Sequence, residues 1–148
     1  MKTCFFTGHR IAPESIYPAL LEAVERHISQ HGVTVFVVGH YGDFDRLAAR
    51  AVKAAKQNHP NITLLLLLPY HPAERPVESP PGFDNTYYPP GMEKVPRQLA
   101  ILRANRYMVE NTDYLIAYVR HPASNAKNLL EYAQKREKRG LLYVENLG

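Results

Sequence analysis

The sequence has 148 residues, of which 45% are hydrophobic and 22% charged. This length and composition predict one folded domain and exclude intrinsic disorder. The longest apolar run, residues 62–68, is interrupted only by Thr63, and it falls well short of the roughly 20 residues that cross a bilayer. We therefore expect no contact with a membrane.

The chain carries 18 Lys and Arg against 14 Asp and Glu, which gives a formal charge of +4. This balance favours anionic partners without choosing among nucleotides and nucleic acids. Part of the excess lies at residues 135–139, directly before Gly140, where cations complement the negative end of a helix. Cys4 is the single cysteine and no signal-peptide pattern precedes it, so we predict a cytoplasmic location.

Apolar runs alternate with helical patterns along the chain, and this order is typical of a parallel sheet with crossover helices. The runs are nearly continuous rather than alternating, which indicates strands covered on both faces. We therefore predict an α/β fold, a Rossmann-like three-layer sandwich with a mostly parallel sheet of about five strands. The expected strands are residues 2–7, 33–38, 62–68, 114–119 and 141–144.

Four helices are expected between these strands. The first covers residues 13–30 and stops at Gly32, and the second begins at Asp43 as its N-cap. The third is expected to bury one stripe of side chains, and the fourth begins near Ser124 or Asn125. The stripe of the third helix is Leu99, Leu102, Arg106 and Val109.

The segment 69–96 interrupts this alternation, because it holds most of the 12 prolines. Proline cannot sit inside a regular helix, so we expect a long loop within a single domain spanning residues 1–148. Tyr87 or Tyr88 of this loop either stacks on a ligand base or anchors the loop to the domain.

The first candidate site motif comes where the first strand ends and consists of Thr7, Gly8, His9 and Arg10. Ligands of open α/β sheets bind at the carboxyl ends of the strands. Glycine lets backbone amides approach an anion closely and arginine adds positive charge. An ordinary turn after a strand also explains the glycine.

The second motif follows the next strand and includes Gly39, His40, Gly42 and Asp43, with Asp45 two residues further on. Both glycines are able to adopt positive φ and to expose amides toward a phosphate or ribose. Asp43 either caps its helix or hydrogen-bonds a ribose. Both motifs are expected at the same edge of the sheet.

The third motif is Ser124, Asn125 and Lys127 at the start of the last helix. Free N–H groups and the positive end of the helix dipole favour an anion there, although Ser124 or Asn125 also suits a plain N-cap. The seven histidines are dispersed, and the pair His27 and His31 is expected to be a solvated helix end rather than a metal site. We predict neither a metal nor a cofactor.

These motifs together resemble the SLOG superfamily of Rossmann-like proteins, in particular its small YpsA-like branch. The matching segments run in family order through nearly the whole chain: residues 7–10, 38–45, 103–109, 113–117, 124–128 and 132–133. The resemblance implies a nucleotide or nucleotide-derived ligand across the strand ends. The same superfamily also includes proteins with other activities, the cytokinin-activating phosphoribohydrolases and the DNA-processing protein DprA.

Two departures from the family weigh against a transfer of enzymatic activity. His40 stands where the second loop usually has its second glycine, and Ser124-Asn125-Ala126 replaces Gly-Gly-Thr. The Arg-Lys pair of the phosphoribohydrolases falls on Ala104-Asn105, with Arg103 and Arg106 beside it, and Glu131 is out of register with their carboxylate. If the protein is a hydrolase, which is the less favoured hypothesis, the catalytic candidates are Arg103, Arg106 and Glu131.

A ligand-binding module, acting as a sensor or sequestering its ligand, is the preferred interpretation. The alternatives are a nucleotide N-glycosidic hydrolase, a nucleic-acid binder with a contiguous basic face, and an interaction protein with a vestigial pocket. The resemblance also makes a homo-oligomer plausible.

Overall fold

A single parallel sheet organises the chain, and a computed structural model describes residues 1–77 and 80–148. Its six strands lie in the order β4-β3-β2-β1-β5-β6, and every neighbouring pair is parallel. The strands are β1 Lys2–Gly8, β2 Val33–Val38, β3 Thr63–Leu67, β4 Asn85–Tyr87, β5 Tyr114–Tyr118 and β6 Tyr143–Asn146.

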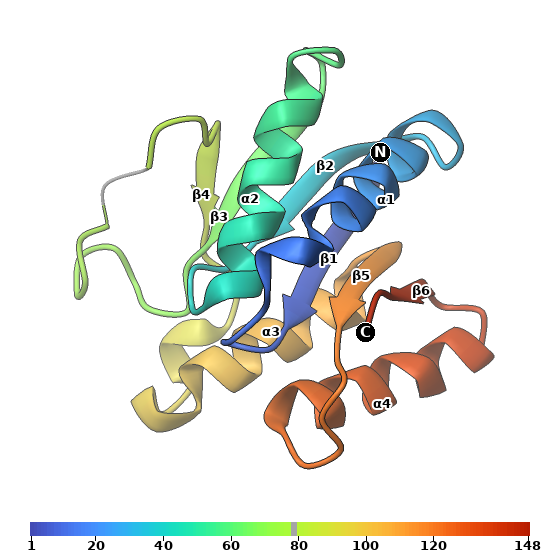
Figure 1. Ribbon diagram of the computed structural model, residues 1–148. Coiled ribbons are helices and arrows are strands. Elements are labelled where there is room, and N and C mark those ends of the chain that lie inside the picture. The colour runs from blue at the N-terminus through green and yellow to red at the C-terminus, as the bar shows by residue number, and fades with distance from the viewer. Residues whose placement is uncertain (78–79) are drawn as a thin grey trace.

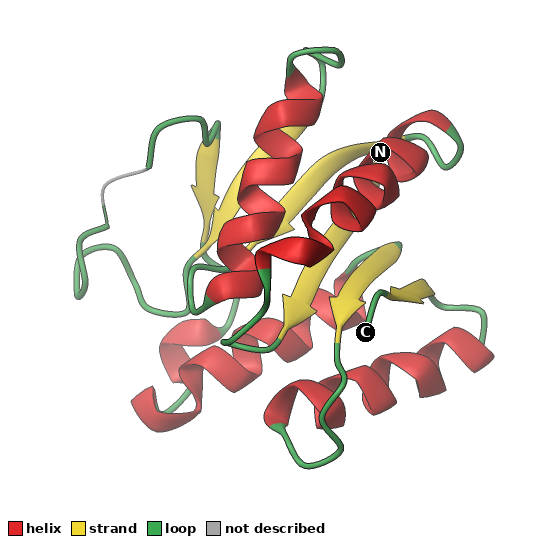
Figure 2. Ribbon diagram, in the orientation of Figure 1, coloured by secondary structure: helices red, strands yellow, loops and turns green. Residues whose placement is uncertain are grey.

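Helices cover both faces of the sheet, and the predicted three-layer α/β sandwich is confirmed (Figures 1 and 2). The longer helices are α1 Tyr17–Ser29, α2 Asp43–Lys56, α3 Ala100–Asn111 and α4 Asn125–Lys138. Short 3-10 turns lie at Glu14–Ile16, Met92–Lys94 and Arg97–Leu99. No helix in the described part of the chain is long and apolar enough to cross a membrane.

Alternate residues of β1 belong to different cores. Cys4 and Phe6 pack with side chains of α1 and α2, whereas Phe5 packs with side chains of α3 and α4. Both faces of the strand are therefore buried, which explains why its sequence is a continuous apolar run. From β1 the chain proceeds outward through β2, β3 and β4 and then returns to β5 on the other side of β1.

The segment 69–96 is not a plain loop, because it contributes β4 at the sheet edge beside β3. The Asp84 carboxylate accepts the Leu64 N–H at 2.8 Å and pairs with Lys56 Nζ at 2.6 Å, which holds the start of the strand. Tyr87 and Tyr88 pack against the α3–α4 core, and the Tyr87 and Tyr107 hydroxyls lie 3.3 Å apart. These contacts support the anchoring role for both tyrosines.

The predicted stripe of α3 is wrong except for Val109. The helix buries Ala100, Ala104 and Met108 beside Val109, whereas Leu99 and Leu102 are 42% and 48% exposed. Small alanines let a helix approach a sheet closely, and close packing here outweighs the larger apolar area of leucine.

Gly8 is required by the close approach of α2 to the end of β1. A Cβ at this position would lie 2.5–2.9 Å from the Phe44 side chain, which is fully buried. Real Cβ atoms do not approach other atoms so closely, so a larger residue forces a displacement of α2 or β1.

We predict that Gly8→Ala lowers the free energy of unfolding by about 1–3 kcal/mol, as overpacking of a rigid core does. Urea unfolding measures the change, and the matched control is the same substitution in a Phe44→Ala background, where the space is free. An equal loss in both backgrounds would show that contact with Phe44 is not the cause.

Candidate functional site

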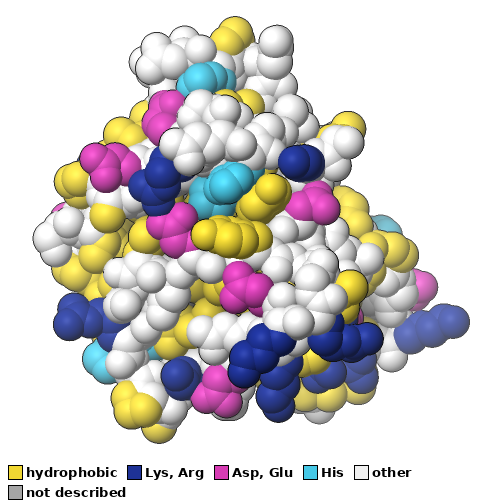
Figure 3. All heavy atoms as spheres, turned by 90° about the vertical axis from the view of Figure 1, so that its right-hand side faces the viewer, with side chains coloured by type: hydrophobic (Ala, Val, Ile, Leu, Met, Phe, Trp, Pro, Cys, Tyr) yellow, Lys and Arg dark blue, Asp and Glu magenta, His cyan; other side chains and the backbone are white. Residues whose placement is uncertain are grey.

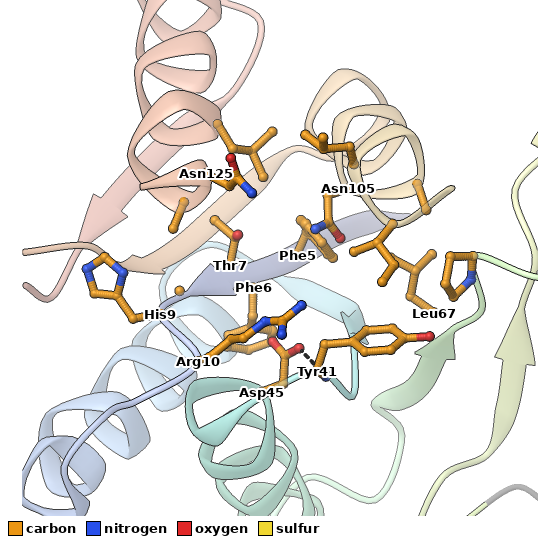
Figure 4. A pocket seen from close by; sticks show the side chains of 18 of the residues that line it. Phe5, Phe6, Thr7, His9, Arg10, Tyr41, Asp45, Leu67, Asn105 and Asn125 are labelled. Carbon is orange, nitrogen blue, oxygen red and sulfur yellow. Dashed lines mark hydrogen bonds between the residues drawn. The ribbon is translucent and has the colours of Figure 1, made fainter. Parts of the chain in front are cut away.

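A cavity of about 440 Å³ opens at the carboxyl ends of the central strands (Figure 4). This volume lies within the range typical of small-molecule sites. It lies between β1 and β5, where the order of the strands in the sheet reverses although all strands stay parallel, and open α/β sheets bind ligands at such a point. The polar residues of its wall are Thr7, His9, Arg10, Tyr41, Asp45, Gln98, Asn105, Ser124 and Asn125.

His9 connects the loop that follows β1 to the loop that follows β5. Its backbone N–H donates to the Tyr118 carbonyl at 3.2 Å, and its Nε2 accepts the N–H groups of Arg120 at 2.8 Å and His121 at 3.2 Å. Burial lowers the pKa of His9, and the nearby His121 lowers it further. A neutral imidazole can accept these bonds, so His9 lines the cavity but uses its Nε2 to order the loops.

The second motif positions Arg10 through its backbone. Gly42 has a φ of 143°, and a Cβ there would lie 2.6 Å from the Arg10 Cα. The Asp43 N–H donates to the Arg10 carbonyl at 2.7 Å, and the Asp43 carboxylate accepts the Ala12 N–H at 3.2 Å. Gly42 and Asp43 therefore lie behind Arg10 and fix the loop from which its side chain reaches the cavity.

The N-cap expectation for Asp43 is wrong, and Gly39 does not use its freedom to adopt positive φ. Asp43 is the first residue of α2 rather than its N-cap, which is Gly42, because the Asp43 carboxylate is directed to the β1 loop. Gly39 is not among the glycines with positive φ. Glycine fits at this position for another reason: a Cβ would lie 2.8 Å from Asp45 Oδ2.

Asp45, for which the sequence predicts no role, supplies a carboxylate to the wall of the cavity. Its Oδ2 accepts the Tyr41 N–H at 3.0 Å, and its side chain faces the cavity from α2 together with Arg10 from the β1 loop (Figure 4). Burial raises the pKa of Asp45 to about 6, against a smaller opposing effect of the Tyr41 N–H. Perturbed carboxyl groups in a cavity are typical of functional sites.

The third motif forms the opposite wall. Ser124 is the N-cap of α4, as one reading of the sequence expected, and its Oγ accepts the Lys127 N–H at 3.1 Å. Ser124, Asn125 and Ala126 line the cavity, and Asn125 faces Asn105 of α3 across it (Figure 4). The first backbone N–H groups of a helix are free for an anion.

Several predicted residues do not line this cavity. Arg103 and Arg106 line a second hollow between α3 and α4. Lys127 Nζ lies 4.0 Å from the Glu131 carboxylate on the same helix, and His40 stacks on Tyr41 with ring centres 4.3 Å apart. The residues brought together at the cavity are Thr7, Gly8, His9, Arg10, Gly39, Ser124 and Asn125; those outside its wall are His40, Gly42, Asp43, Lys127, Arg103, Arg106 and Glu131.

The remaining wall comes from residues that were not predicted to contact a ligand, although Asn105 lies in the segment 103–109 that carries part of the family resemblance. Asn105 follows the buried Ala104 on α3, and Leu67, Pro69, Ile101 and Leu102 add apolar surface. Asn105 lies between the buried residues Ala104 and Met108 of α3. Its position at the cavity can be predicted only when the buried face of this helix is known.

His27 is fully buried, so the expected solvated helix end is wrong for this residue. Its Nδ1 lies 2.6 Å from the Ala23 carbonyl, and its ring packs edge-on against His31 and Tyr114. Burial lowers the pKa of His27. Residues 1–77 and 80–148 contain no group of three or more His, Cys, Asp or Glu that would hold a metal ion.

Comparison with protein-family models and with curated proteins finds no match for this chain.

Asp45 makes stability depend on pH in a defined direction. Because its pKa is raised to about 6 in the folded protein, its proton is bound more tightly in the folded than in the unfolded state. Its contribution favours folding at low pH, and this contribution is lost as the pH rises through about 4 to 6.

We predict that Asp45→Asn raises the free energy of unfolding at pH 7.5 by up to about 3 kcal/mol, because an amide keeps the bond to Tyr41 and removes the buried charge. The gain should disappear near pH 4. Urea unfolding at several pH values measures it, with Asp43→Asn as the control on the same turn. A gain that persists unchanged at pH 4 would contradict the assignment.

Proposed function

We propose that the protein binds a nucleotide or nucleotide-derived anion in the cavity at the carboxyl ends of β1 and β5, as a sensor or by sequestering it. One observation carries the proposal: the wall of the cavity brings together a cation, hydrogen-bonding side chains and apolar side chains. A phosphate, a ribose and a base need these three kinds of partner.

The part of the wall that contains Arg10 is expected to bind the phosphate. Arg10 has an exposed side chain at the cavity, and the first turn of α4 faces it from the other side with Ser124, Asn125 and Ala126. A guanidinium forms charge-assisted bonds to phosphate oxygens, and free N–H groups at a helix start add to them. These polar and charged groups therefore come from the two loops that follow β1 and β5.

The other walls suit the nucleoside. Asp45 rather than Asp43 offers a carboxylate to ribose hydroxyls, because Asp45 faces the cavity. Asn105 and Gln98 supply amides that pair with the edge of a base. Leu67, Pro69 and the ring of Tyr41 provide apolar contact for its faces.

A nucleotide N-glycosidic hydrolase is the second candidate, and Asp45 is the observation that favours it. Glu131 is exposed and pairs with Lys127 outside the cavity, so a role as general acid or base passes from Glu131 to Asp45. A carboxyl group with a pKa of about 6 exchanges protons readily near neutral pH. Arg103 and Arg106 then have no place in the reaction.

Nucleic acid is a weaker candidate partner. The last turn of α4 carries Lys135, Arg136 and Lys138, and Lys and Arg side chains gather on the lower part of the face in Figure 3. Gly140 ends this segment with a φ of 74°, so the cations also fit a helix end. A cytoplasmic location and a homo-oligomer belong to the same proposal as expectations.

We predict that AMP raises the unfolding temperature of the wild-type protein and that Arg10→Ala removes most of this shift, because the phosphate loses its cation. A ligand at about 100 times its Kd adds roughly 2.7 kcal/mol of apparent stability. Thermal unfolding with adenosine, AMP, ADP and ATP measures it, and chromatography of the same samples detects released adenine.

Arg139→Ala is the matched control, since Arg139 is exposed at the far end of α4. An equal loss in both variants would point to the basic helix end as the binding surface. Binding that falls steeply with salt and favours oligonucleotides would support the nucleic-acid reading.

A further inference from the structure

A second hollow of about 240 Å³ lies between α3 and α4 on the outer side of the sheet sandwich. Leu99 and Leu102 are among the exposed large apolar residues of the protein, and both line this groove. Arg103, Arg106 and Tyr132 also line it.

The groove shares a wall with the main cavity. Leu102, Asn125 and Leu129 line both hollows. Asn125 is the first residue of α4, and its side chain faces the cavity (Figure 4). The two hollows are therefore adjacent, with these three residues between them.

The chemistry of the groove combines cations with flat and apolar surface. The Arg106 guanidinium lies 4.3 Å from the centre of the Tyr132 ring, and its Nε lies 3.7 Å from the Glu110 carboxylate. The Tyr132 hydroxyl donates to the same carboxylate, and Arg103 adds a second exposed cation. Two cations and one anion leave a net positive groove, and guanidinium and phenol planes stack on aromatic groups.

We propose that the groove is a second subsite for the same small ligand, and that the ligand carries a second planar group with an attached negative charge. This inference rests on the proposed function, because the first nucleotide unit occupies the main cavity. The chemical class is a nucleotide extended through its phosphate by a second aromatic, anionic unit. Arg103 and Arg106, which the cavity leaves unused, bind the extension.

The test compares AMP with pApA, the 5′-phosphorylated adenylyl dinucleotide, by isothermal titration calorimetry on the full-length protein. We expect pApA to bind roughly tenfold more tightly than AMP, which corresponds to about 1.4 kcal/mol. Arg103→Ala and Arg106→Ala should each remove most of that gain and leave AMP binding unchanged. Both side chains are exposed, and circular dichroism checks that the variants fold.

The outcomes separate this inference from the proposed function. AMP binding without any gain for pApA overturns the second subsite and leaves the first nucleotide site standing. Absence of binding by both ligands overturns both proposals. A gain that survives both substitutions, or that Arg139→Ala removes equally, places the extension elsewhere and overturns the inference. So does a change of oligomeric state in the two variants, which would make the groove an interface.

Discussion

The central position of β1 is the constraint on which the rest of the structure depends. The strand pairs with β2 on one side and β5 on the other, and its side chains enter both cores. The chain must leave β1 toward α1 and leave β5 toward α4, on opposite faces. The two loops therefore separate at the edge of the sheet and leave a cavity that backbone cannot fill.

The loops at this edge are held by close contacts at two glycines and by the His9 side chain. Gly8 lies against Phe44, Gly42 lies against Arg10, and His9 accepts two N–H groups from the β5–α4 loop. These contacts hold Arg10, Asp45 and Asn125 around one space before a ligand arrives. A preorganised site of this kind loses less conformational entropy on binding.

The Asp45 carboxylate lowers the stability of the fold at neutral pH, while the proposed function uses it to bind a ligand. A partly buried carboxylate opposes folding at neutral pH, and its acceptance of the Tyr41 N–H offsets this only in part. The fold tolerates this cost because the sheet and its two cores stabilise the same region. Under the proposed function, a bound ribose donates hydrogen bonds to the carboxylate and reduces the cost.

Continuous apolar runs were sufficient for five of the six strands, and periodicity was sufficient for most helices. A run such as Val33–Val38 is recognisable because four of its six residues are buried. These patterns were insufficient for β4, since a strand of three residues between prolines has no period to read. Periodicity also misplaced the buried face of α3, where Ala100 and Ala104 pack in place of Leu99 and Leu102.

The motifs at the strand ends identified Thr7, Gly8, His9, Arg10, Gly39, Ser124 and Asn125 as neighbours, and the structure brings these residues to one cavity. Asp45 and Asn105 were not predicted as ligand contacts, because their exposure to the cavity depends on how α2 and α3 pack. Asp43 and Asp45 are indistinguishable in sequence, yet one carboxylate is directed to the β1 loop and the other to the cavity.

The most direct test of the central claim is a titration of the ¹⁵N-labelled protein with AMP, followed by amide chemical shifts. The account predicts that the largest changes occur at Arg10, Tyr41, Asn125 and Ala126, which surround the cavity. Changes confined to the last turn of α4 around Lys135, or no changes at saturating AMP, would contradict it.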